Sequence, residues 1–223
     1  MSERTTIIFG NGLGMALEPN YFELKKALSY VWETSTELTG QHKALIKSAL
    51  PEMAVDGYPE SEEMLNELHV AIIATEILSG YETERVAWLN DNSRDVPEAF
   101  KKFVHEVALY FHSSDKSLPI DFVSSLSSYI QQTKSHVGVL NYDNLLYDAL
   151  CRTHILKGYS GTLIDGFLST SGFAAENMDR MTPKKLGWFL HLHGSPLYID
   201  NKKVDGIVRD FLEPNHKWLT ILS

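Results

Sequence analysis

Residues 5–14 read TTIIFGNGLG, a short β-branched and apolar run that ends directly in glycines. A buried strand followed at once by a glycine turn is typical of the opening of a dinucleotide-binding unit, where backbone N–H groups face a pyrophosphate. Glycine suits such a turn because a Cβ atom would obstruct the phosphates or a required positive φ. We therefore expect an α/β fold with a Rossmann-like parallel sheet, and a ligand cradle formed by Gly10, Asn11, Gly12 and Gly14.

The spacing of these glycines departs from the dehydrogenase pattern. Gly10 and Gly12 occupy the first two positions of G-x-G-x-x-G, but Met15 stands at the third and Gly14 comes one residue early. No second strand precedes Glu33, near which an acidic residue that binds a ribose would fall. Taken alone, the glycines are equally typical of a plain tight turn, so their interpretation depends on the later strands.

The run His136–Leu140 is a second candidate strand, and it leads into Asn141-Tyr142-Asp143. In an open parallel sheet, ligands bind in the crevice outside the carboxyl ends of the strands. Asn141 and Asp143 are therefore candidate catalytic residues. Asp143 or Asn144 is also suited to cap the helix that begins near Leu145, whereas Asn141 lies too far ahead of that helix for the same role.

A further candidate strand, residues 186–193, ends in His193-Gly194-Ser195, and residues 162–167 form another. A histidine at a strand end beside a glycine is exposed to a cleft and able to accept a proton near neutral pH. His193 is therefore the candidate general base, and Gly194 and Ser195 are expected to line the ligand site. His191 is interpreted as a buried core histidine. Because no third His or Cys stands at a suitable spacing, no metal site is expected.

Between these motifs, the periodicity is helical from residue 21 to residue 132. The clearest amphipathic stretch has six apolar residues on one helical face: Phe100, Phe103, Val104, Val107, Ala108 and Phe111. A crossover between parallel strands needs only one helix, so this length predicts a helical insertion. We expect the Rossmann-like domain at residues 1–20 and 133–223, the insertion at residues 21–132, and a short helix at residues 214–223.

Composition restricts the classes of function. The 223-residue chain has a formal net charge of −9, whereas binding to nucleic acid or anionic membranes needs clustered Lys and Arg. No apolar run approaches the roughly 20 residues of a membrane span, and no signal-peptide pattern opens the sequence. The one cysteine, Cys151, excludes an internal disulfide and a four-cysteine zinc site. We expect a cytoplasmic protein that binds neither nucleic acid nor membranes directly.

Taken in order along the chain, these motifs resemble the sirtuin family, and more closely its prokaryotic sirtuin-like branch, which is associated with NAD+ depletion in antiphage defence. Three matches carry the resemblance: Gly10-Asn11-Gly12 is similar to the Gly-Ala-Gly turn of sirtuins, Asn141-Tyr142-Asp143 to their Asn-x-Asp motif, and His193-Gly194-Ser195 to their catalytic His-Gly. The resemblance covers residues 5–14 and 136–196. It implies an NAD+ hydrolase that releases nicotinamide and ADP-ribose.

Departures from the family narrow this expectation. No arginine follows the glycine turn where deacylases carry Asp-Phe-Arg, and the chain lacks the cysteines of the family's zinc module. The resemblance thus implies NAD+ cleavage without zinc rather than protein deacylation. The family's final Gly-Thr/Ser strand is not evident after His193, so we expect a domain truncated at its C-terminal side.

By the same resemblance, Asn141 orients the attacking water or ribose hydroxyl, His193 is the base, and Asp143 holds the nicotinamide side. The resemblance also implies a homo-oligomer and a partner protein, either a nucleic-acid sensor or a hexameric ATPase. An alternative is a regulatory module that binds NAD+ or ADP-ribose without cleaving it, which the short segment after His193 favours. A protein deacylase is a further alternative.

Overall fold

The computed structural model describes residues 4–49, 57–79, 91–157, 161–167, 178, 187–196, 198–203 and 206–211. The chain divides into two compact units. The sheet unit comprises residues 1–19 and 111–223, and the helical unit comprises residues 20–110. The architecture is an α/β, Rossmann-like fold with a helical insertion, as the sequence predicts.

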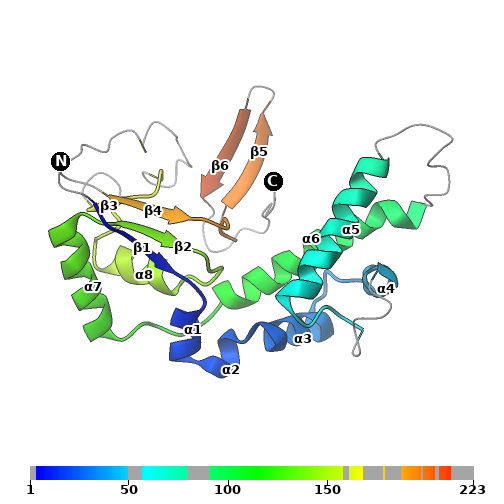
Figure 1. Ribbon diagram of the computed structural model, residues 1–223, viewed down its shortest axis with the longest axis horizontal. Coiled ribbons are helices and arrows are strands. Elements are labelled where there is room, and N and C mark those ends of the chain that lie inside the picture. Colours follow the sequence, from blue (N-terminus) through cyan, green and yellow to red (C-terminus); the bar gives the residue numbers. More distant parts are fainter. Residues whose placement is uncertain are drawn as a thin grey trace. The chain divides into compact units, whose positions relative to one another are not determined.

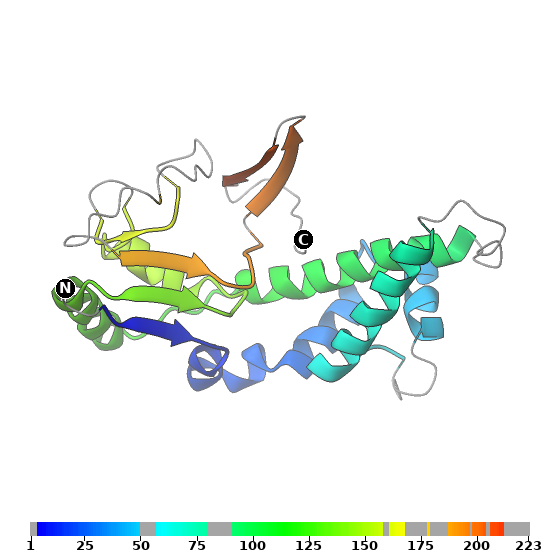
Figure 2. The ribbon, with the colours of Figure 1, turned by 45° about the horizontal axis from the view of Figure 1, so that its top comes forward.

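Four parallel strands form the main sheet, in the order β1-β2-β4-β3 (Figure 1). They are β1 (Thr6–Phe9), β2 (His136–Val139), β3 (Leu163–Ile164) and β4 (Gly187–His191). The register places Phe9 opposite Val139 and Val139 opposite His191, so three strands end level with one another (Figure 2). The expected strands are confirmed, although the one predicted at residues 162–167 is reduced to two residues.

Helices α7 (Ile120–Thr133) and α8 (Leu145–Arg152) bury their apolar sides against this sheet. The shared core consists of Ile130, Val137, Val139, Leu146, Leu150, Ile155, Leu156, Leu163 and Phe189. Full burial of one such aliphatic or aromatic side chain stabilises the fold by roughly 1.5–3 kcal/mol. Because strand side chains alternate between the two faces, the face that takes Phe189 also takes His191.

The helical unit is built from successive helices, which are α2 (Pro19–Phe22), α3 (Leu24–Thr34), α4 (Gly40–Ala49), α5 (Glu62–Ser79) and α6 (Asp91–His112). Of these helices, α3 and α6 are strongly amphipathic. The first residue of α2 and the last two residues of α6 belong to the sheet unit. On α6 the predicted apolar face is buried, with Phe100 at 3% and Phe103 at 0% exposed. The unit ends at residue 110 rather than at residue 132, because α7 packs its Ile130 into the core of the sheet unit.

The remaining elements belong to the sheet unit. Helix α1 (Gly12–Leu17) follows the glycine turn, and β5 (Tyr198–Lys203) pairs antiparallel with β6 (Gly206–Phe211). The short helix predicted at residues 214–223 lies outside the described residues. Within the described ranges, no helix combines the length and apolar character needed to cross a bilayer.

Candidate active site

The three sequence motifs follow β1, β2 and β4, and the structure brings them to one edge of the sheet. The pairing of the strands continues past their ends, because the N–H of Leu140 donates to the carbonyl of Phe9 at 3.0 Å. Likewise, the N–H of Leu192 donates to the carbonyl of Val139 at 2.9 Å. The carboxyl ends of the strands thus meet where the sequence predicts a ligand site.

The glycine turn is joined directly to the Asn-x-Asp motif. Nδ2 of Asn141 donates a hydrogen bond to the carbonyl oxygen of Gly10 at 2.9 Å, and Asn141 is only 8% exposed. A Cβ atom placed on Gly10 or Gly12 would meet no other atom within 4 Å. Neither residue is among the glycines with positive φ. Their contribution is therefore open space beside the turn, and not the left-handed backbone that the sequence also allowed.

Asn11 and Gly14 belong to the helix that follows this turn. Asn11 is the N-cap residue of α1, with φ −57° and ψ −17°, and its side chain makes no capping hydrogen bond. Gly14 is buried within α1, and its carbonyl accepts the N–H of Glu18 at 2.9 Å. Of the predicted cradle, Gly10 and Gly12 therefore border open space, while Gly14 lies inside the helix.

Asp143 both holds the start of α8 and faces the site. Its Oδ1 accepts the backbone N–H of Leu145 at 3.1 Å, so the capping role is present. Burial raises the pKa of Asp143, and hydrogen bonds from Leu145 and Asn141 oppose that shift. Asn144, the N-cap residue by backbone position, makes no capping bond and donates to Asp148 instead, at 2.7 Å.

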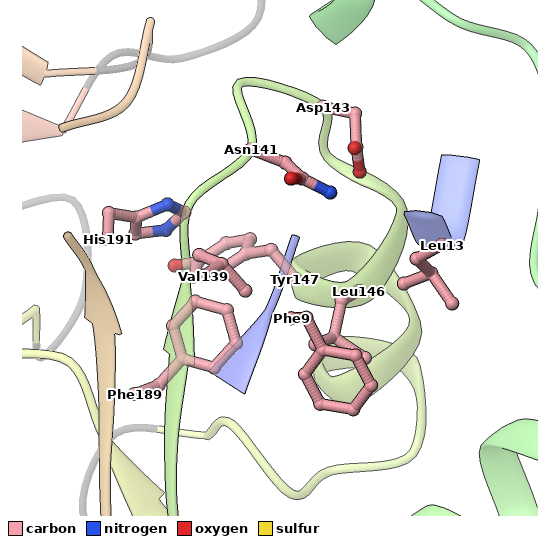
Figure 3. Close-up of a pocket in the computed structure, with 9 residues that line it drawn as sticks. All are labelled: Phe9, Leu13, Val139, Asn141, Asp143, Leu146, Tyr147, Phe189 and His191. Carbon is pink, nitrogen blue, oxygen red and sulfur yellow. The ribbon is translucent and has the colours of Figure 1, made fainter. Parts of the chain in front are cut away.

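A pocket opens at this edge of the sheet (Figure 3). It is lined by Phe9, Leu13, Val139, Asn141, Asp143, Leu146, Tyr147, Phe189 and His191. The two polar side chains of the Asn-x-Asp motif lie toward one end, and aromatic rings form much of the wall (Figure 3). No space as large as a water molecule is left between these side chains, so the pocket is a closely packed recess. Because ligand pockets usually span about 300–1,000 Å³, a ligand ring could enter this recess only if the lining side chains move apart.

The two histidines of β4 take different positions. His191 lines the pocket, with its ring centroid 5.1 Å from that of Phe189 and 5.4 Å from that of Tyr147. Burial lowers the pKa of His191 to about 4, with a smaller contribution from His112, so the imidazole is neutral at pH 7. This burial fits the interpretation of His191 as a core histidine, and strand alternation also places it among the residues that line the recess.

His193 lies on the turn that follows β4 and is exposed. The turn is closed by a hydrogen bond from the N–H of Gly194 to the carbonyl of His191, at 3.2 Å. Gly194 has a φ of +80°, a left-handed conformation that favours glycine. The ring centroid of His193 is 6.4 Å from that of Tyr142, within the Asn-x-Asp motif, and Ser195 is 5% exposed.

Two residues near the pocket were not singled out by sequence analysis. Tyr147 lies on α8 and lines the pocket, and its hydroxyl donates to Oδ2 of Asp165 at 2.9 Å. The second residue is Asp165, which stands between an apolar run and Gly166. A polar residue directly after an apolar run is the same pattern that identified Asn141 and His193 as candidates. No comparable local pattern marks Tyr147, because its place depends on how α8 packs.

Comparison with known proteins adds no family assignment. No protein-family model matches the chain, and no curated protein is significantly similar to it. The fold defines the class, an α/β, Rossmann-like protein with a partly polar pocket at the carboxyl edge of its sheet. A function must therefore be argued from the chemistry of that pocket.

Proposed function

We propose that the protein is a cytoplasmic NAD+ hydrolase that releases nicotinamide and ADP-ribose. The observation that carries the proposal is the hydrogen bond between Asn141 and Gly10, made beside a pocket that Asp143 also lines. It ties the glycine turn to the Asn-x-Asp motif at the carboxyl edge of a parallel sheet, which is where such sheets bind dinucleotides.

The reaction breaks the bond between nicotinamide and C1′ of the ribose and joins a water oxygen to C1′. One proton of that water passes to a base and then to solvent. Nicotinamide leaves a cationic ring as a neutral molecule, so its departure needs no acid. The barrier is the positive charge that builds on the ribose, as in the oxocarbenium-like transition state of glycoside hydrolysis. The site must therefore position a nucleophile and a base.

Asn141 is suited to position the nucleophile. Its amide nitrogen donates to the Gly10 carbonyl at 2.9 Å, and its amide group lowers the pKa of the neighbouring Asp143 carboxyl against the effect of burial. We therefore assign Oδ1 of Asn141 to accept a hydrogen bond from the attacking water or from a ribose hydroxyl. Asp143 is assigned to the nicotinamide side, where its partly buried carboxyl group is next to Asn141.

The other predicted residues complete the proposal. His193, on the exposed turn after β4, is assigned as the base because its ring is accessible and lies near the Asn-x-Asp motif. The open space beside Gly10 and Gly12 leaves room for the pyrophosphate, and we assign the nicotinamide end to the recess that Asn141 and Asp143 line. Gly194 and Ser195 would shape the site through their turn. By the family resemblance, the setting is antiphage defence, as a homo-oligomer with a sensor or ATPase partner.

The test is the release of nicotinamide from NAD+ by the purified protein, followed by chromatography. We expect Asn141→Ala and His193→Asn each to lower turnover by at least about 100-fold. The matched controls are Asn20→Ala and His154→Asn, both at exposed positions. Asparagine is chosen for position 154 because His154 has a φ of 60°, which asparagine tolerates.

Three outcomes are informative. Loss in the two site variants but not in the controls supports the assignment. Wild-type rates in both site variants contradict it. Tight binding of NAD+ with no nicotinamide release would instead identify a regulatory module that senses the dinucleotide.

A further inference from the structure

The fourth strand of the sheet also ends in a polar residue. Asp165 directly follows β3, and its Oδ1 accepts the backbone N–H of Phe167 at 2.9 Å. β3 ends opposite Trp188, three residues before β4 ends at His191. Asp165 is accordingly not among the residues that line the pocket. Any influence on the site must pass through a neighbouring side chain.

Tyr147 is that neighbour. Its hydroxyl donates to Oδ2 of Asp165 at 2.9 Å, while its ring lines the pocket. The rings of Tyr147, Phe189 and His191 contact one another, with centroid separations of 5.5 Å, 5.4 Å and 5.1 Å. Figure 3 shows the three rings together on one side of the pocket. Tyr147 and His191 both pack edge-to-face on Phe189 and contact each other in a tilted arrangement. Because such ring contacts have preferred geometries, a shift of Tyr147 would also shift His191.

The carboxyl group of Asp165 is kept in an unfavourable environment. Burial raises the pKa of Asp165, and hydrogen bonds from Phe167 and Tyr147 oppose that shift. Burial, with the carboxylates of Asp165 and Asp148, raises the pKa of the Cys151 thiol to about 12, so that thiol stays protonated. A buried carboxylate is costly unless it is hydrogen-bonded, and perturbed groups of this kind gather at functional sites.

His191 is the member of the ring cluster best suited to contact a ligand. Because its imidazole is neutral at pH 7, one ring nitrogen donates and the other accepts. A neutral imidazole suits a ribose hydroxyl, which also donates and accepts, better than it suits an anionic phosphate. His191 pairs in register with Val139, two residues before Asn141, so it belongs to the same end of the sheet as the proposed nucleophile-positioning residue.

We propose that Asp165 is a positioning residue: by holding the Tyr147 hydroxyl, it fixes the His191 ring where that ring contacts the ribose next to the bond that is cut. The proposal rests on the proposed NAD+ hydrolase function for the identity of the ligand. The contact itself, between a ribose hydroxyl and His191, applies equally to ADP-ribose, which allows a separate test.

The experiment compares four single variants and one double variant in the full chain. Asp165→Ala and Tyr147→Phe remove the hydrogen bond that holds the ring. Asp165→Asn keeps a polar partner for the Tyr147 hydroxyl. The control Tyr129→Phe removes a hydroxyl from a ring that is 44% exposed on α7. Nicotinamide release and calorimetric binding of ADP-ribose are measured for each, together with the melting temperature.

We expect Asp165→Ala and Tyr147→Phe to lower kcat/KM by about 10-fold or more, since misplacement of a contact group is costly in catalysis. ADP-ribose binding should weaken about fivefold, as expected for one hydrogen bond. Asp165→Asn should stay within about threefold of the wild type in both measurements. The double variant Asp165→Ala/Tyr147→Phe should lose no more activity or affinity than either single variant, because Asp165 acts on the ring cluster only through the Tyr147 hydroxyl.

A purely structural role for Asp165 would give a different result. In that case Asp165→Ala lowers the melting temperature while kcat/KM and ADP-ribose binding of the folded protein stay unchanged, which overturns the proposal. Equal losses in Asp165→Asn and Asp165→Ala overturn it as well. If the wild type binds ADP-ribose but releases no nicotinamide, the hydrolase proposal fails while the proposal for Asp165 still stands. The ADP-ribose affinities of the variants then decide the role of Asp165. If the wild type does neither, both proposals fail.

Discussion

The sheet unit and the helical unit both have apolar cores, but they differ in the polar groups that they bury. The helical unit buries aromatic and aliphatic side chains such as Phe22, Phe100 and Phe103. Among the buried polar side chains of the described ranges, His105 lies in the helical unit, and the others are Ser127, Ser135, Asn141 and Ser195 in the sheet unit. Ser127 lies on α7 and Ser135 precedes β2, whereas Asn141 and Ser195 follow β2 and β4 at the carboxyl edge of the sheet. Burying polar groups is costly, so Asn141 and Ser195 mark an edge where the fold serves more than its own stability.

The first way to test this comparison is to truncate one aromatic core residue in each unit. Phe103 is 0% exposed and Phe189 is 1% exposed. We expect Phe103→Ala and Phe189→Ala each to lower the free energy of unfolding by about 3–5 kcal/mol, because each leaves a cavity in a packed core. Chemical denaturation monitored by circular dichroism measures both.

Similar losses would show that packing supports both units alike, so that the difference between them is confined to polar groups. The contrary result is a loss below about 1 kcal/mol in one unit, which would mean that its core collapses around the cavity.

The second test uses one histidine from each unit whose pKa is lowered by burial, His105 in the helical unit and His191 in the sheet unit. Burial lowers the pKa of both His105 and His191. A lowered pKa in the folded state means that the unfolded chain binds the proton more tightly, so stability is present above about pH 6.5 and is lost as the pH falls. For His191, the change from 6.5 to about 4 sets an upper bound of about 3 kcal/mol.

We therefore expect His191→Gln and His105→Gln each to flatten the decline of unfolding free energy between pH 6.5 and pH 4, measured by urea denaturation at several pH values. The residual slope comes from other histidines whose pKa burial lowers, His112 and His136 among them. Only His191→Gln should also reduce nicotinamide release, because only His191 lines the pocket. Equal losses of activity in both variants would contradict the comparison.

Sequence patterns predicted the sheet edge well, because its parts are local. A short apolar run, followed by glycine, asparagine or histidine, predicts both a buried strand and its end. The same rule applied to residues 162–167 predicts a strand, but the pattern by itself assigns no role to Asp165. Its partner Tyr147 is brought to it only by the packing of α8 against the sheet, which a single sequence does not specify.

The two histidines and the domain boundary show the limit of periodicity. Alternation places His191 on the same face as Phe189 but does not say that this face opens into a pocket. The apolar face of α7 has the same period as the helices of the helical unit. Only the contact of Ile130 with the sheet core assigns it to the sheet unit. Periodicity predicts which face of a helix is buried, but tertiary packing determines which part of the molecule covers that face.

The smallest expected effect comes from exposed ion pairs, which occur in both units with the same i,i+4 spacing. In the helical unit, Nζ of Lys102 lies 3.0 Å from Oε1 of Glu98, and in the sheet unit Nη2 of Arg152 lies 3.8 Å from Oδ2 of Asp148. The four side chains are 32–69% exposed, so solvent and salt screen the attraction.

We expect Lys102→Gln and Arg152→Gln each to change the free energy of unfolding by no more than about 0.5 kcal/mol, and by less at 0.5 M NaCl. Denaturation at two salt concentrations checks both. A loss above 1 kcal/mol for Arg152→Gln alone would show that the polar network of the sheet unit extends to the outer side of α8, and the contrast between the units would then include exposed polar groups as well as buried ones.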